Sequence, residues 1–294
     1  MKTNSLSAWI LAVRPYSLGN SVIIVAVASA LAYTDGGFRL VPALLCLAFA
    51  VLMQCTANLV NDLWDSLKGA DNPDRLGPDR AFAKGFITMR GMKWGIALFT
   101  LASCIAGCGL LLYGGLWLVA VGAACVVAAY FYTAGPYPLA YHGLGDVAVV
   151  IFFGIIPVGF TYYLQTGCWT TETTLVAVAC GLVIDTMLML NNFRDVNEDA
   201  AAHKRTIVVM LGKGFGKWGY LMLGFAAVAI CLGLIAYGRL WAGILPLIYA
   251  VMHYTVWRKM VAIDHGDELN VCLGLTARNI IVFGILLTAG ILLG

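Results

Sequence analysis

The sequence predicts an all-α polytopic membrane protein, a bundle of nine transmembrane helices with a cytoplasmic N-terminus. Of its 294 residues, 61% are hydrophobic and 11% are charged, whereas soluble domains carry roughly 25% charged residues. The mean hydropathy is +0.88, and apolar runs recur along the whole chain. Lysine and arginine gather in alternate connections between these runs, which is the pattern of a multi-pass membrane protein. The composition therefore excludes a soluble globular domain.

Nine apolar segments approach the length of about 20 residues that a helix needs to cross a bilayer. In chain order they are 18–34, 40–60, 93–113, 116–133, 145–165, 173–191, 217–237, 240–257 and 275–293. The first segment has a second interpretation as a signal peptide, because Lys2 and Arg14 precede it and Ala28-Ser29-Ala30 resembles a cleavage site. The eight segments that follow favour an uncleaved first helix instead.

The distribution of positive charge predicts the topology. With the N-terminus in the cytoplasm, all of the 18 Lys and Arg residues except Arg39 and Arg239 fall on the cytoplasmic side. Such a bias supports an odd number of spans. The long polar loops 61–92 and 191–216 then both face the cytoplasm. We expect one transmembrane domain, 1–294, in the inner (plasma) membrane of the cell.

Acidic residues gather at the ends of the second and sixth apolar segments. Eight of the 15 acidic residues lie within 62–79 or 195–199. A carboxylate at a membrane boundary is costly unless it is hydrated, paired or bound to a cation. Two sets of polar residues are spaced to share one face of a helix. These sets are Asn58, Asp62 and Asp65, and Asn191, Asp195 and Asp199.

Hard oxygen ligands in this arrangement suit Mg²⁺, which takes one or two carboxylates and leaves positions for water and phosphate oxygens. A phosphate would explain the basic residues beside both clusters. These residues are Arg75, Arg80, Lys84, Lys204 and Arg205. For either cluster alone, solvated loop charges at a helix end are the simpler interpretation. Two clusters on the same membrane side favour one divided metal–diphosphate site. The nine cysteines and four histidines form no metal-binding pattern.

Several motif stretches cover most of the connections assigned to the cytoplasm. They are Arg14-Pro15, 58–65, Gly69-Ala70-Asp71, 75–80, 132–133 through 143–146, Phe152-Phe153-Gly154, 191–195 through Asp199, and Lys204-Arg205-Thr206. Together these stretches resemble the UbiA superfamily of intramembrane prenyltransferases. The form of 75–80 (Arg-x-Gly-Pro-x-Arg) and of 191–195 (Asn-Asn-x-Arg-Asp) is similar to the branch that prenylates 1,4-dihydroxy-2-naphthoate. The 4-hydroxybenzoate branch usually has a lysine after the fourth helix, and 134–144 contains none.

The resemblance implies a site and a reaction. Asp62, Asp65, Asp195 and Asp199 would hold Mg²⁺ and the diphosphate of a polyprenyl diphosphate, with Asn58 and Asn191 assisting. The basic residues would neutralise the leaving diphosphate, with Arg80 and Lys204 foremost. The prenyl cation would attack the ring of 1,4-dihydroxy-2-naphthoate, with loss of CO₂. Nucleic acid is not an expected partner.

The acceptor side of the site has fewer candidates. Tyr132 and Phe153 are the aromatic pocket candidates, since a cation must meet aromatic faces before it meets water. Asp146, at the start of the fifth segment, could orient or deprotonate the acceptor hydroxyl, or it could simply begin a helix. Asp185 lies deep in the sixth segment and has no family motif position. Other acceptors (4-hydroxybenzoate, haem or a chlorophyll precursor) and a cation-coupled transporter are the alternatives.

Overall fold

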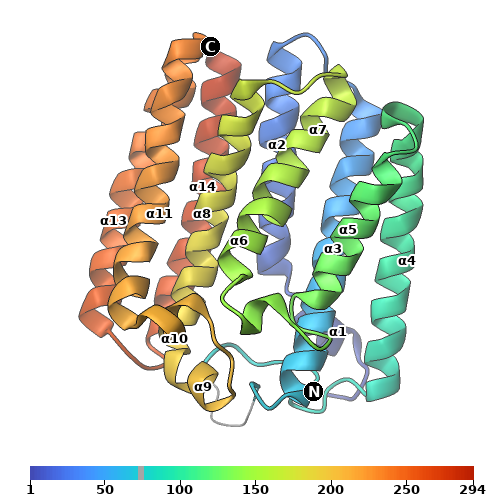
Figure 1. Cartoon of the computed structure of the whole chain (residues 1–294), viewed down its shortest axis with the longest axis vertical. Helices are drawn as coiled ribbons and strands as arrows, with labels where there is room; N and C mark the ends of the chain where they lie inside the picture. The colour runs from blue at the N-terminus through green and yellow to red at the C-terminus, as the bar shows by residue number, and fades with distance from the viewer. Residues whose placement is uncertain (72–75) are drawn as a thin grey trace.

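The protein is a bundle of long helices (Figure 1). The computed structural model describes residues 1–71 and 76–294. Within those residues there is no β-strand, only an isolated bridge between His142 and Arg205. The all-α prediction is confirmed. The helices in chain order are α1 Leu6–Val13, α2 Pro15–Thr34, α3 Leu40–Leu67, α4 Met89–Gly114, α5 Leu118–Phe131, η1 Leu139–Tyr141, α6 Gly145–Val149, η2 Val150–Ile155, α7 Ile156–Thr166, α8 Thr171–Arg194, α9 Val196–Ala201, α10 Ile207–Leu211, α11 Lys213–Gly233, η3 Leu234–Tyr237, α12 Leu240–Ile244, α13 Pro246–Ile263 and α14 Leu269–Leu293.

Eight helical stretches of the described chain are long and apolar enough to cross a membrane. The polytopic membrane fold is therefore confirmed. The remaining expected segment, 116–133, coincides with α5, which has only 14 residues and is shorter than the length of about 20 that a straight span needs. The count of nine spans and the cytoplasmic N-terminus accordingly stay predictions.

The helices that carry the acidic clusters end differently. α3 continues seven residues past its apolar segment to Leu67, and Lys68 caps it before Gly69 turns the chain with φ +78°. α8 stops at Arg194, and Asp195 is the capping residue with φ −92° and ψ 15°. The expected continuous stripe from Asn191 to Asp199 is therefore broken, because α9 begins a new direction after the cap.

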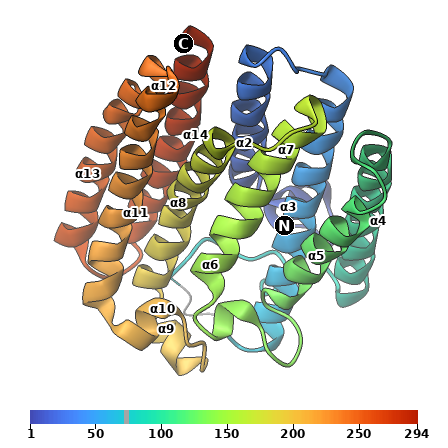
Figure 2. The same ribbon diagram turned by 45° about the horizontal axis from the view of Figure 1, so that its top comes forward.

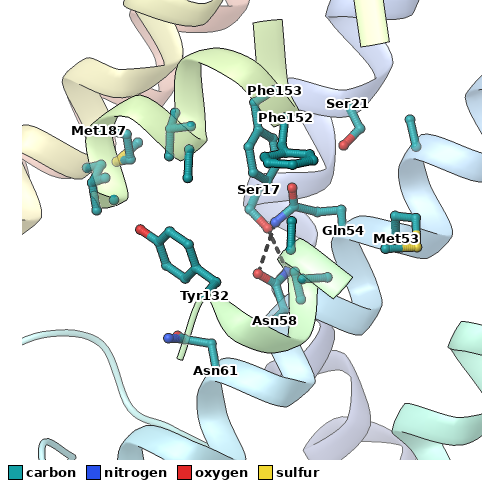
Figure 3. Close-up of a pocket in the computed structure, with 18 of the residues that line it drawn as sticks. Ser17, Ser21, Met53, Gln54, Asn58, Asn61, Tyr132, Phe152, Phe153 and Met187 are labelled. Carbon is teal, nitrogen blue, oxygen red and sulfur yellow. Dashed lines mark hydrogen bonds between the residues drawn. The ribbon is translucent and has the colours of Figure 1, made fainter. Parts of the chain in front are cut away.

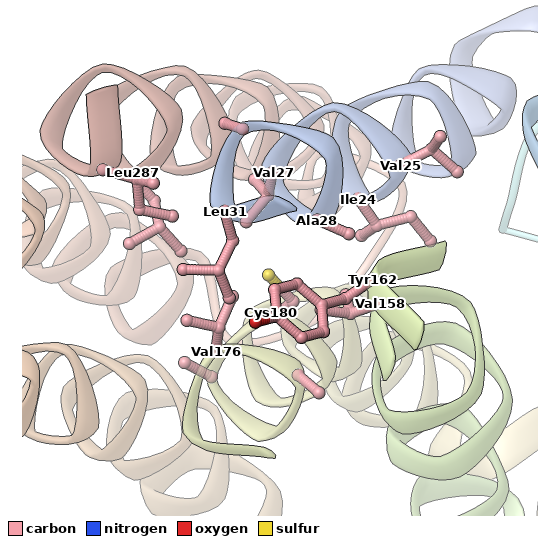
Figure 4. Packing of buried hydrophobic residues seen from close by; sticks show 14 of the residues in the cluster. Ile24, Val25, Val27, Ala28, Leu31, Val158, Tyr162, Val176, Cys180 and Leu287 are labelled. Atoms are coloured by element: carbon pink, nitrogen blue, oxygen red, sulfur yellow. The ribbon is translucent and has the colours of Figure 1, made fainter. Parts of the chain in front are cut away.

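The core is formed where α2 passes between other long helices. Figure 4 shows Ile24, Ala28 and Leu31 of α2 packed against side chains of α7, α8 and α14. Ala28 and Leu31 are fully buried. Small residues on α2 let its neighbours approach closely, which is how helices associate in lipid.

One end of the bundle gathers the connections that the sequence predicts to carry the chemistry. α1, α9 and α10 lie together at the end of the molecule that also holds the N-terminus, and the C-terminus lies at the opposite end (Figure 1). The view in Figure 2 keeps α9 and α10 at that end, below α8 and α6. The fold thus brings loops separated by more than 100 residues to the same end of the bundle.

Candidate active site

A cavity of about 680 Å³ opens inside the bundle at the end that holds both polar loops. It is lined by residues of α2, α3, α4, α5, α8, α14 and the continuous α6–η2–α7 segment. Its polar lining residues include Arg14, Asn58, Asn61, Asp65, Arg80, Asp146, Asn191, Asn192, Asp195, Lys204 and Asn270. Its apolar lining includes Ile24, Phe49, Leu110, Leu118, Val121 and Leu164. One ligand in this cavity would therefore contact charged side chains and apolar side chains at the same time.

From the first polar set on a helix face (Asn58, Asp62 and Asp65), Asp65 is the carboxylate that lines the cavity. Its side chain is buried, and its two oxygens each accept a hydrogen bond: Oδ1 from the hydroxyl of Tyr141 at 2.9 Å and Oδ2 from the amide of Asn61 at 2.7 Å. Tyr141 comes from the connection before α6, so Asp65 is fixed from two elements. These donors hold the carboxylate in one orientation toward the cavity.

Asp195 and Asp199 represent the second cluster. Arg194 binds both oxygens of Asp195, at 2.6 and 2.7 Å, and it also donates to Asn270 at 2.8 Å. Asn270, at the start of α14, donates in turn to the carbonyl of Leu76 at 2.7 Å. This network ties the end of α8 to α14 and to the loop after α3.

Lys204 lies between the two clusters. Its Nζ is 3.2 Å from Oδ1 of Asp199, and it interacts electrostatically with Asp65 and Asp195 as well. Burial favours the neutral amine, but these carboxylates outweigh it and raise the pKa of Lys204. Burial raises the pKa of Asp199 to about 6, and the charge of Lys204 opposes that rise. Tertiary structure thus brings carboxylates of both clusters to the same cation, Lys204.

Arg80 reaches the same site from the loop after α3. Its Nε lies 3.5 Å from Oδ2 of Asp71, and it lines the cavity. Asp71 is itself held near Asp65, because its backbone N–H donates to the carbonyl of Asp65 at 3.3 Å. Asp71 therefore forms an ion pair with Arg80 within the loop after α3.

Asp62 occupies a different face of α3 from the one that the sequence predicts. It is fully buried, it does not line the cavity, and its Oδ2 accepts the backbone N–H of Phe82 at 3.3 Å. At 3.6 residues per turn, Asp62 points roughly 70° away from the mean direction of Gln54, Asn58, Asn61 and Asp65. Asn61 takes the place in the cavity, and the metal role of Asp62 stays a prediction.

Two of the predicted basic residues are described by the structure but are not in the cavity lining. Lys84 is half exposed and pairs with Asp79 at 3.2 Å. Arg205 is exposed, and its backbone rather than its side chain is held, by the carbonyl of Tyr141 at 3.2 Å. Arg75 lies outside the described residues. Their roles at the diphosphate stay predictions.

The acceptor-side candidates all lie at or beside the cavity. Tyr132 and Phe153 line it, and Figure 3 shows both rings in the pocket. Asp146 also lines it, and its Oδ1 is buried with no hydrogen-bond partner among the described residues. Asp185 is outside the lining, but it interacts electrostatically with Asp146. Two carboxylates therefore sit close together at this wall.

Some site residues were not predicted individually. Arg14 lines the cavity, and its Nη2 donates to Oδ1 of Asn61 at 3.2 Å. Gln54 donates to Oδ1 of Asn58 at 3.0 Å, and Asn58 donates to Ser17 at 2.9 Å (Figure 3). The spacing of Gln54, Asn58, Asn61 and Asp65 within an apolar helix was the signal that could have found Gln54 and Asn61. Tyr141 and Asn270 carried no such signal, since both lie in other elements.

The donor set fits a divalent cation that arrives with phosphate. Within residues 1–71 and 76–294, no three His, Cys, Asp or Glu side chains converge as a metal site by themselves. Asp65, Asp195 and Asp199 nevertheless supply hard oxygens, and Oδ2 of Asp199 is buried with no hydrogen-bond partner in the described chain. Because Mg²⁺ is usually bound by one or two carboxylates together with water and substrate phosphates, these residues suit it.

Within this helical membrane bundle, the cavity joins an end lined by carboxylates and cations to an apolar channel. This division of polarity suits an amphiphilic ligand. A model of the UbiA prenyltransferase family matches residues 21–273. The chain is 34% identical over 295 aligned residues to the 1,4-dihydroxy-2-naphthoate octaprenyltransferase of Escherichia coli (strain K12), with 96% of each chain covered. It is 36% identical over 239 residues to the protein of that name from Haemophilus influenzae (strain ATCC 51907 / DSM 11121 / KW20 / Rd), covering 79% of this chain and 77% of the relative.

Solved structures agree on the fold. A UbiA homologue from Aeropyrum pernix K1 has a TM-score of 0.70 at 18% identity, covering 95% of this chain and 98% of the homologue. A UbiA homologue from Archaeoglobus fulgidus, bound to DMAPP and Mg²⁺, has a TM-score of 0.62 at 15% identity, covering 96% and 99%. The chain belongs to the UbiA prenyltransferase family, and it is a prenyltransferase.

Proposed function

We propose that the protein transfers a polyprenyl group from polyprenyl diphosphate to 1,4-dihydroxy-2-naphthoate, with Mg²⁺ as cofactor and with loss of CO₂ and diphosphate, giving demethylmenaquinone. The observation that carries this proposal is one cavity that has Asp65, Asp195, Lys204 and Arg80 in its polar lining and continues into a channel lined by apolar side chains. A diphosphate with a long hydrocarbon tail has the same division of polarity.

The charged end would hold the diphosphate and favour its departure. Lys204 and Arg80 line this end of the cavity. They would donate to phosphate oxygens and so stabilise the charge that develops as the allylic C–O bond breaks. Asp65, Asp195 and Asp199 are the residues that would hold Mg²⁺, which supplies further charge neutralisation when it is bound. The hydrogen bonds from Tyr141 and Asn61 keep Asp65 aimed at this position before substrate enters.

The ring acceptor would lie between the diphosphate end and the aromatic wall. As the C–O bond breaks, its electron pair leaves with diphosphate, and the ring supplies the pair that forms the new C–C bond. The bond to the carboxylate carbon then breaks, its electrons return to the ring, and CO₂ leaves. Asp146 faces the cavity with an oxygen that has no partner in the described chain, so it is suited to accept a hydrogen bond from the acceptor hydroxyl and orient the ring.

The choice of acceptor is supported by the names of the two bacterial relatives and by the absence of lysine from 134–144. The Lys and Arg distribution supports an active site that faces the cytoplasm from the inner membrane. The chain length of the prenyl group depends on the apolar channel, not on the motif residues.

The deciding experiment supplies purified protein with Mg²⁺, carboxyl-labelled 1,4-dihydroxy-2-naphthoate and polyprenyl diphosphates of several lengths. We expect prenylated product by mass spectrometry, with one labelled CO₂ released for each product molecule. Competing 4-hydroxybenzoate in the same reaction tests the alternative acceptor. Prenyl transfer without CO₂ release, or transfer only to 4-hydroxybenzoate, would exclude the naphthoate carboxylate as the acceptor.

A further inference from the structure

The wall of the cavity formed by α6, η2 and α7 has an unusual spacing. One series of lining residues recurs at every fourth position: Gly145, Val149, Phe153, Pro157 and Thr161. A parallel series runs at the same interval from Ala148 to Leu164. Both series face one cavity along the whole length of the segment.

An uninterrupted α-helix does not keep such a series on one side. At 3.6 residues per turn, each step of four residues advances the direction by roughly 40°, so four steps turn it by roughly 160°. The residues Val150–Ile155 form a π-helix, in which the N–H of Ile156 donates to the carbonyl of Ile151. Its wider turn uses more residues, and it therefore cancels part of this drift.

The local sequence explains why the turn widens here. Pro157 has no N–H to donate, and its ring would clash with a carbonyl one turn earlier, so an α-helical turn is unfavourable at this place. Gly154 and Gly181 let the π turn and α8 touch backbone to backbone. A Cβ on Gly154 would lie 2.6 Å from the carbonyl oxygen of Ala177, and one on Gly181 would lie 2.9 Å from that of Val150. Backbone atoms cannot give way as a flexible side chain does.

The consequence is that two consecutive aromatic side chains, Phe152 and Phe153, both line the cavity. Figure 3 shows the two rings in the pocket that also contains Tyr132. We propose that the π turn, held by the Gly154–Gly181 contact, is the device that presents both phenyl rings to the reacting carbon as a water-excluding wall. Phe152 and Phe153 contact the prenyl group, and Gly154 and Gly181 are positioning residues. This inference rests on the proposed function.

The proposed wall should change the ratio of two reaction products, which can be measured. When the allylic C–O bond breaks, the electron pair leaves with diphosphate, and the prenyl cation has two partners. Attack by the acceptor ring forms a C–C bond and gives the prenylated product. Attack by water forms a C–O bond, and loss of a proton gives a prenyl alcohol. Aromatic faces stabilise a cation in a desolvated site, so the two rings favour the first path over the second.

The test measures the ratio of prenyl alcohol to prenylated acceptor, with both quantified in one reaction of the full chain in lipid nanodiscs. We expect Phe152→Leu and Phe153→Leu each to raise this ratio by about tenfold, because leucine fills much of the volume but has no π face. Gly181→Ala is expected to raise it as well, with the KM for polyprenyl diphosphate unchanged, since Gly181 is outside the cavity lining. Gly233→Ala is the matched control, because an added Cβ there meets nothing within 4 Å.

The outcomes separate the inference from the proposed function. A folded Gly181→Ala protein with lower turnover but the wild-type ratio would make the glycine contact merely structural and overturn its positioning role. Wild-type ratios in both leucine variants would overturn the aromatic wall, whether or not Gly181→Ala folds. A wild-type protein that releases prenyl alcohol but prenylates no aromatic acceptor would overturn the proposed function together with this inference.

Discussion

Replacing Lys204 with glutamine should lower kcat/KM for polyprenyl diphosphate by about 100-fold. Lys204 is the cation that lies among the carboxylates of both clusters, 3.2 Å from Asp199 and within electrostatic range of Asp65 and Asp195. Removing it takes away a donor to the phosphate oxygens and leaves the carboxylates to repel the incoming anion. Glutamine keeps most of the length and some hydrogen bonding, so the change isolates the charge.

The magnitude follows from the burial of the site. A hydrogen bond to a charged group contributes about 1.5–3 kcal/mol, and the side chain of Lys204 is only 17% exposed, which favours the upper part of that range. A loss of about 2.7 kcal/mol in kcat/KM corresponds to the factor of about 100. Because the proposed position of the acceptor is beyond the diphosphate end, the KM for the acceptor should change little.

The assay is steady-state transfer with each substrate varied in turn. Lys213→Gln is the matched control, since Lys213 pairs with Asp264 at 3.1 Å on the exposed surface and such pairs contribute little. Lys204→Arg should recover part of the activity by restoring the charge. If Lys204→Gln keeps kcat/KM within about threefold of wild type, the assignment of Lys204 to the diphosphate is wrong.

Three further outcomes are expected. Asp195→Ala should abolish turnover while membrane insertion persists; Mg²⁺-dependent transfer retained by this variant would remove Asp195 from the metal site. Burial raises the pKa of Asp199 to about 6 in the folded protein, above the value of about 4 for an exposed aspartate. As the pH falls from 7 to 5, Asp199 therefore takes up a proton in the folded, metal-free protein before it would in the unfolded chain, which stabilises the metal-free state, and this proton competes with the cation. The Mg²⁺ concentration that gives half-maximal activity should therefore rise; a constant value would contradict this reasoning. At the other end of the bundle, Arg239 pairs with Asp35 and, at 2.8 Å, with Glu172. Arg239→Gln should lower the melting temperature by roughly 2–6 °C, measured by thermal unfolding in detergent, without changing kcat, and a loss of kcat at unchanged stability would count against a purely structural role.

The fold was accessible from the sequence because hydrophobicity in a membrane protein is a local property. Each apolar segment reports its own span, and all nine expected segments coincide with helices. The length of α5 was less accessible. Its apolar pattern extends over 116–133, but the helix itself covers only Leu118–Phe131, since the residues on either side turn into connections.

The candidate site was accessible in part for the same reason. Asp65, Asp195 and Lys204 stand out as charges at apolar boundaries, and all three line the cavity. The direction of Asp62 was not accessible, because the side of α3 that faces the cavity is chosen by the helices packed around it. Tyr141 and Asn270 were missed since their contacts join residues 76 positions apart in each case.

The sequence by itself determined that the chain crosses a membrane many times and that two polar loops combine acidic and basic residues. Only the tertiary structure decided that Lys204 lies between the two acidic clusters, that Asn61 rather than Asp62 lines the cavity, and that a π turn brings Phe152 and Phe153 to one wall. The physical reason is range: hydropathy and charge act through neighbours in sequence, whereas the direction of a side chain depends on which helices pack against its own.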